Sequence, residues 1–199
     1  LKAANIGIAV GSGSDVAKSV ADLILLDDNF KTIVATIEEG KKILSNIKKM
    51  FVYLMSNALD ELFLIGGAII VGVAMPLSAV QIIWVNLFTG SLPAIAFAFD
   101  EQQMRETKKT SKIFFDSRVL FLTIWIGIIV SLLLFVQYTT LLSIGVPIAT
   151  AQSVLFACFG SYTLFISFSF RDLSRPLWKY SLTDNRLLVV GVAVGSLLL

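Results

Sequence analysis

The residues most able to do chemistry lie in two short polar runs within otherwise apolar sequence. The first run is NALDEL at residues 57–62, and the second is WVNLFTGSLP at residues 84–93. A carboxylate inside a membrane-spanning helix costs about 2.5 to 3.5 kcal/mol on insertion scales, so Asp60 and Glu61 need a cation, a proton or a buried partner. Together the two runs predict a cation site between two helices.

The second run also contains residues that weaken a helix. Pro93 has no N–H to give to the carbonyl one turn earlier, and Gly90 relaxes the local backbone. We therefore expect the helix to open its backbone at mid-membrane. Carbonyl oxygens from Asn86 to Thr89 would then turn inward as ligands.

The composition is that of a membrane protein. The chain has 199 residues, of which 56% are hydrophobic and 15% are charged, and this excludes an ordinary soluble domain. The absence of histidine excludes His-ligated metal sites and His-based catalysis. Cys158 is the only cysteine, so a disulfide within the chain is impossible. Because the chain begins at Leu1 and ends within an apolar run, we expect an internal fragment or a truncated gene.

The N-terminal part predicts soluble structure followed by a long helix. Residues 1–32 contain two short apolar runs, IGIAV and LILL, separated by a glycine-rich turn and a helical segment, which predicts half of a βαβ layer. From residue 33 apolar residues recur at spacings of three and four, with Lys49 among the charged residues of the opposite face. No proline occurs before Pro76, so one helix is expected to run from residue 33 to about 73, half in water and half in lipid.

Four further apolar segments predict the remaining spans, of which the last is incomplete. They cover residues 77–98, 119–142, 146–170 and 187–199. Basic residues concentrate in alternate connections, which assigns the soluble start and those connections to the cytoplasm. These residues are Arg105, Lys108, Lys109, Lys112, Arg118, Arg171, Arg175, Lys179 and Arg186.

The ordered string IGIAVGSGSDVAKSVADLILLDDNFKTIVATIEEGKKI, followed by the long helix and by WVNL and LPAIAF, resembles the P-type cation-transporting ATPases, especially the calcium-pump-like branch. The resemblance implies a predominantly α-helical multi-pass membrane protein with a small N-terminal α/β piece of a HAD-like (Rossmannoid) phosphorylation domain. Residues 1–32 would end that domain, and residues 33–75 would be the stalk and the family's fifth membrane helix. Residues 76–199 would be the sixth to ninth membrane helices, with the last one truncated.

The same resemblance implies an ATP-driven cation pump whose catalytic parts precede this chain. The phosphorylated aspartate, the nucleotide-binding domain and the first four membrane helices would lie in a missing N-terminal part, so no catalytic residue is expected here. Mg2+ and ATP would be bound mainly by that part, and the fragment alone should be inactive. The implied partners are membrane lipid, the missing part of the pump and the transported cation, with Ca2+ as the candidate; no nucleic acid is expected. The location would be an integral membrane one, the plasma membrane in a prokaryote.

The resemblance also suggests particular cation ligands. Aligned without gaps, Glu61 falls on the fifth-helix glutamate that binds cations in calcium pumps, and Asn86 and Thr89 fall on the sixth-helix asparagine and threonine. Asn57 lies four residues before Glu61 on the same helix face and replaces a family asparagine that would stand one residue later. Asp60 is about 100° around the helix from Glu61, so both carboxylates cannot point straight at one ion. For Asp60 an ion pair or hydrogen bond to a neighbouring helix is the equal alternative.

Gly90 is the main departure from the family. It occupies the position of an aspartate that two calcium sites share, so we do not expect a two-calcium site. Two alternatives therefore stay open. One is a non-catalytic or degenerate membrane protein whose polar residues only hold helices together, and the other is a proton or monovalent-cation pump with Glu61 as the titrating group.

The run GSGSDVAK resembles the family's loop near the phosphorylation site, which implies a role for Gly11, Ser12, Gly13, Ser14 and Asp15. Direct phosphate contact is one interpretation. A glycine-rich turn in which Ser14 caps the following helix is at least as well supported. The adjacent pair at residues 27–28 predicts either a metal pair or, preferably, a turn that caps the next helix.

Overall fold

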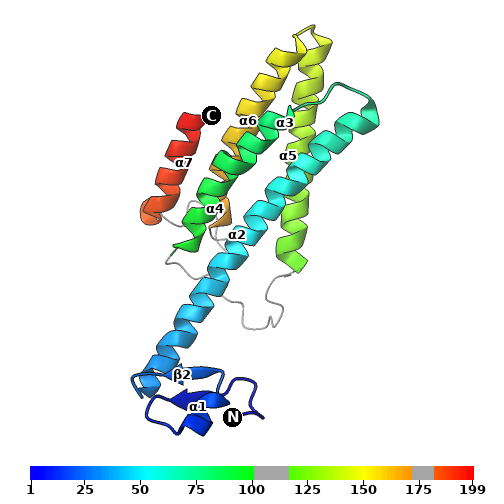
Figure 1. Ribbon diagram of the computed structural model, residues 1–199. Coiled ribbons are helices and arrows are strands. Elements are labelled where there is room, and N and C mark those ends of the chain that lie inside the picture. Colours follow the sequence, from blue (N-terminus) through cyan, green and yellow to red (C-terminus); the bar gives the residue numbers. More distant parts are fainter. Residues whose placement is uncertain (101–116, 172–181) are drawn as a thin grey trace. The chain divides into compact units, whose positions relative to one another are not determined.

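The computed structural model describes residues 1–100, 117–171 and 182–199. Contacts divide the chain into two compact units, Leu1–Leu44 and Ser45–Leu199, each described here by itself (Figure 1). Six of the basic residues that predict the orientation lie outside the described residues. These are Arg105, Lys108, Lys109, Lys112, Arg175 and Lys179.

The first unit contains a small parallel sheet. Strand β1 (Ile8–Val10) pairs in parallel with β2 (Leu23–Leu25), and the short helix α1 (Asp15–Ser19) connects them. The sequence predicts this helix over residues 15–22, but it ends earlier, at Ser19. The predicted order of strand, helix and strand is confirmed, whereas assignment of this unit to a HAD-like domain stays a prediction.

The predicted long helix is present as α2 (Phe30–Val71), which begins in the first unit and ends in the second. It stops at Gly72, whose φ of 75° is a left-handed conformation that a side chain would strain. The N–H groups of Gly72 and Val73 bond back to the carbonyls of Ile69 and Ala68, which satisfies the last turn.

Four helices of the described chain are long and apolar enough to cross a membrane. After α2 comes a span of three consecutive pieces, α3 (Ala79–Trp84), the π-helix η1 (Val85–Gly90) and α4 (Ser91–Ala98). The others are α5 (Ser117–Ser143) and α6 (Ile148–Phe170), followed by the 3-10 turn η3 (Leu182–Asp184) and the shorter apolar helix α7 (Arg186–Leu198). These helices confirm the predicted apolar segments.

The helices of the second unit pack in pairs, with α5 against α6 and α4 against α7 (Figure 1). Small residues permit the close approach: a Cβ at Gly191 of α7 would lie 3.3 Å from the Leu92 carbonyl oxygen of α4. Tyr53 of α2 is fully buried among α4 and α6, in edge-to-face contact with Phe97 at a centroid distance of 5.5 Å.

The buried face of α2 in this unit combines polar and apolar residues. Its buried residues are Asn46, Lys49, Val52, Tyr53, Ser56, Asn57, Asp60, Leu64 and Ala68. In contrast, Ile47 and Leu54 of the predicted apolar stripe are 39% and 42% exposed. Lys49 is therefore not on an open charged face as the periodicity suggested. A membrane helix turns apolar side chains to lipid and polar ones to its protein neighbours, which inverts the pattern of soluble helices.

Candidate cation site

Glu61 and Asn86 meet between α2 and η1, as the sequence predicted. The Asn86 Nδ2 donates to Glu61 Oε1 at 2.8 Å and lies 3.1 Å from Glu61 Oε2. The same amide nitrogen lies 3.1 Å from the carbonyl oxygen of Ile82, one turn earlier on its own helix. Glu61 is half-buried and Asn86 is exposed, so this pair is open on one side. The carboxylate thus has a neutral amide as its partner rather than a fixed cation.

The backbone around Asn86 does not open, and that expectation is wrong. The segment Val85–Gly90 stays helical but widens to a π-helix, and the α-helix resumes at Ser91. The Thr89 hydroxyl donates to the Val85 carbonyl at 2.7 Å, and the Ser91 hydroxyl donates to that of Asn86 at 2.8 Å. Side-chain hydroxyls satisfy these carbonyl oxygens, so unwinding brings no gain.

Pro93 nevertheless has the local effect predicted for it. Without an N–H at Pro93, the Thr89 carbonyl lacks its usual donor one turn on. The Tyr53 hydroxyl of α2 lies 3.3 Å from that oxygen and 3.3 Å from the Thr163 carbonyl oxygen of α6. Tyr53 therefore joins three helices at the level of the π segment.

Asn57 and Thr89 lie on the same two elements as the Glu61 pair, α2 and η1, but both are buried. Thr89 is fully buried, and Asn57 is 4% exposed. The Asn57 Oδ1 has no hydrogen-bond partner among the described residues. The Asn57 Nδ2 lies 3.9 Å from the point where a Cβ of Gly90 would stand. Gly90 therefore places no side chain beside Asn57.

Asp60 faces a different interface from Glu61. Its side chain points at α5, where a Cβ on Gly127 would lie only 2.8 Å from Asp60 Oδ1. The Ser131 hydroxyl of α5 donates to the Asp60 backbone carbonyl at 3.1 Å. Of the five predicted ligands, Asp60 therefore lies apart from the Glu61 and Asn86 pair.

The glycine-rich loop of the first unit is held by contacts with other residues of that unit. Ser14 caps α1 by accepting a hydrogen bond from the Ala17 N–H at 3.3 Å, as predicted, and Asp15 stands in the first turn. The Ser12 N–H donates to Asp28 Oδ1 at 3.1 Å. Cβ atoms on Gly11 and Gly13 would each lie 2.9 Å from a backbone carbonyl oxygen, of Leu25 and Val10 respectively.

The two aspartates before α2 act as turn residues. Hydrogen bonding from Ser12 lowers the pKa of Asp28, which has a left-handed φ of 51°. The Thr32 hydroxyl donates to Asp27, which lowers the pKa of that carboxyl. The Asn29 side chain accepts from the Lys31 N–H at 3.0 Å in the first turn of the helix. These contacts support the capping interpretation of the acidic pair.

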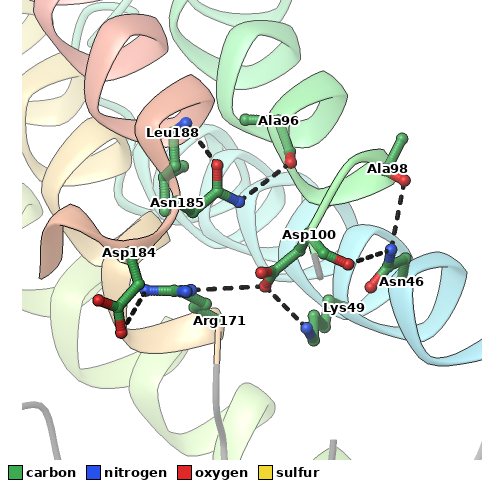
Figure 2. Close-up of polar contacts among 9 residues, drawn as sticks. All are labelled: Asn46, Lys49, Ala96, Ala98, Asp100, Arg171, Asp184, Asn185 and Leu188. Atoms are coloured by element: carbon green, nitrogen blue, oxygen red, sulfur yellow. Dashed lines mark hydrogen bonds and ion pairs between the residues drawn. The ribbon is translucent and has the colours of Figure 1, made fainter. Parts of the chain in front are cut away.

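A second buried polar cluster was missed by the sequence reasoning. Figure 2 shows Asp100, just after α4, between Lys49 of α2 and Arg171 at the end of α6. Asp100 Oδ2 lies 2.8 Å from Lys49 Nζ and 3.5 Å from Arg171 Nε, and all three side chains are 1% exposed. The Asn46 Nδ2 donates to the Asp100 backbone oxygen at 2.8 Å. The available signal in the sequence was the acidic residue Asp100 directly after an apolar span.

Comparison with known proteins was made for the whole chain. The family described as "Cation transporting ATPase, C-terminus" matches residues 74–199. "Calcium-transporting ATPase 1" of Bacillus cereus is 33% identical over 100% of this chain and 24% of its own length. Human "Calcium-transporting ATPase type 2C member 1" is 35% identical over 100% of this chain and 22% of itself. "Probable cation-transporting ATPase F" of Mycobacterium bovis is 32% identical over 99% of this chain and 22% of itself. The chain thus spans about a quarter of the length of the curated relatives that it matches.

Proposed function

This chain belongs to the cation-transporting ATPases, and from that membership we propose that it supplies part of the ion site of an ATP-driven cation pump. The observation that supports the proposal most is the contact of Glu61 with Asn86, at 2.8 Å, between two apolar helices. A carboxylate in a span is retained for a function or a partner, and here its partner is a neutral amide. Such a pair can exchange its internal hydrogen bond for a bound cation.

Binding would require a small rearrangement of Asn86. Its amide nitrogen now faces Glu61, and a half turn about the terminal bond of the side chain presents its oxygen instead. The cation would then meet carboxylate and amide oxygens, the hard ligands that Ca2+ and Na+ prefer. Asn57 and Thr89 supply further oxygens in our proposal. The open side of the pair would receive ligands from a part of the whole protein outside this chain.

We propose Ca2+ as the transported ion, with one ion rather than two. Two of the relatives named above are described as calcium-transporting. Gly90 supplies no second carboxylate beside Asn57, which lowers the charge available for a divalent ion. This same observation favours a monovalent-cation or proton pump as the second candidate. In either case ATP and Mg2+ would be bound by the rest of the protein. The N-terminal unit would lie in the cytoplasm, and α2 would transmit the movement of that unit to the ion site.

The experiment is phosphoenzyme formation from radiolabelled ATP by the full-length protein, tested with Ca2+, Na+, K+, Mn2+ and across pH. Stimulation by Ca2+ that Glu61→Gln abolishes is the expected result. The matched control is Asp184→Asn, because that carboxylate is 43% exposed and lies outside the spans. Stimulation by a monovalent ion or by protons alone would favour the second candidate. No phosphoenzyme under any condition would refute the pump and favour a non-catalytic membrane protein.

A further inference from the structure

A group of buried oxygen atoms takes no part in the contact between Glu61 and Asn86. Within the described chain, six side-chain oxygens on residues 56–60 of α2 and on α6 are buried without a hydrogen-bond partner. They are Ser56 Oγ, Asn57 Oδ1, both carboxylate oxygens of Asp60, Tyr162 Oη and Thr163 Oγ1. Buried polar atoms are normally paired, so a group of buried side-chain oxygens without partners needs an explanation.

Asp60 is the charged member of this group. It is 1% exposed, and the absent side chain of Gly127 leaves room for its carboxylate against α5. The Tyr162 hydroxyl of α6 faces the same carboxylate, and Ser131 of α5 reaches the backbone of Asp60. Side chains of α5 and α6 therefore contact Asp60, whereas Glu61 contacts Asn86 of η1.

No protein cation neutralises Asp60 in the described part of the chain. The buried basic side chains there, Lys49 and Arg171, pair with Asp100. An isolated buried carboxylate is unfavourable by several kcal/mol, whereas a bound cation with oxygen ligands removes that cost. A single carboxylate among neutral oxygens balances one positive charge, which selects a monovalent ion over a divalent one.

We propose that Asp60, Tyr162 and Ser131 form a second cation site, between α2, α5 and α6, which binds one monovalent ion such as Na+. The Asp60 carboxylate provides the charge, and the Tyr162 and Ser131 hydroxyls provide neutral oxygens. The site is separate from the Glu61 and Asn86 pair, and it does not require that pair to bind the transported ion. Gly127 maintains the space, since any side chain there would collide with the carboxylate.

The test is equilibrium binding of radioactive Na+ to the purified full-length protein, at constant ionic strength with choline chloride. The wild type should bind one Na+ per chain, and Asp60→Asn should lose it. Tyr162→Phe removes one hydroxyl only and should weaken binding about tenfold, as expected for one lost ligand interaction. Gly127→Ala should weaken binding by displacing the carboxylate. The Asp60→Asn result counts only if that variant folds. Tyr162→Phe therefore provides an independent measurement.

Glu61→Gln is the control that separates the two sites. It should leave Na+ binding intact while abolishing Ca2+-stimulated phosphoenzyme formation. Failure of the second-site proposal can thus be distinguished from failure of the proposed function. Absence of saturable Na+ binding to the wild type would overturn the second site. So would Na+ binding that persists unchanged in Asp60→Asn and Tyr162→Phe, or binding that Glu61→Gln abolishes.

Discussion

Replacing Asp100 by asparagine should destabilise the membrane region more than any other conservative change among the described residues. The substitution keeps the shape of the side chain but removes the charge that faces Lys49 at 2.8 Å and Arg171 at 3.5 Å (Figure 2). Breaking a buried ion pair from one side costs about 3 to 5 kcal/mol, because the remaining charge stays buried without compensation. Both cations lose this carboxylate, but Arg171 still has Asp184 at 4.0 Å, so we expect the lower part of that range.

The assay is detergent-induced unfolding of the full-length protein in mixed micelles, followed by tryptophan fluorescence. Asp184→Asn is the matched control: Asp184 lies 4.0 Å from Arg171 but is 43% exposed, and a solvent-exposed pair contributes at most about 1 kcal/mol. Adding Lys49→Met to Asp100→Asn should recover part of the loss by removing a buried charge that has lost its carboxylate partner at 2.8 Å. Equal effects of Asp100→Asn and Asp184→Asn would refute the argument that the buried network stabilises this end of the helices.

Three further substitutions test other parts of the structure. Gly90→Asp places a carboxylate beside Asn57, where a Cβ meets nothing closer than 3.4 Å, so equilibrium binding of radioactive Ca2+ should tighten about tenfold; unchanged affinity would contradict this account of Gly90. Tyr53→Phe should lower the free energy of unfolding by about 1 to 3 kcal/mol, because the Thr89 and Thr163 carbonyls lose their hydroxyl partner. Gly72→Ala should destabilise α2 by about 1 to 2 kcal/mol because of its positive φ, whereas Gly66→Ala, in open space within the helix, should be neutral or stabilising in the same unfolding assay.

The elements of the fold were predictable from sequence because each depends on local pattern. Apolar length predicts the spans, and the lack of a proline before Pro76 predicts the unbroken α2. The divergence of Asp60 and Glu61 also follows from helix geometry alone, and the structure confirms it. What lies opposite each carboxylate depends on the packing of separate helices. That part was therefore beyond the sequence pattern.

Lys49 illustrates the limit most clearly. The periodicity of α2 assigns it to a charged face, but its partner Asp100 is 51 residues away along the chain. No pattern within α2 reports that partner. The π-helix was not predictable either. Gly90 and Pro93 suggest an unwound segment, but the hydroxyls of Thr89 and Ser91 bond to its carbonyls and the segment stays helical.

Two adjacent carboxylates on one helix turn, facing different neighbours, have a thermodynamic consequence. Glu61 contacts η1 while Asp60 faces α5 and α6, so a rotation of α2 that alters one contact must alter the other. If both proposed sites exist, an ion at Asp60 favours the orientation of α2 that it binds best, and thereby changes the affinity at Glu61. Linkage requires the converse effect to have the same magnitude. Na+ should therefore shift the Ca2+ affinity of the wild type and leave that of Asp60→Asn unchanged. No shift in the wild type would show that the two carboxylates act independently, and equal shifts in both proteins would show that Na+ does not act through Asp60.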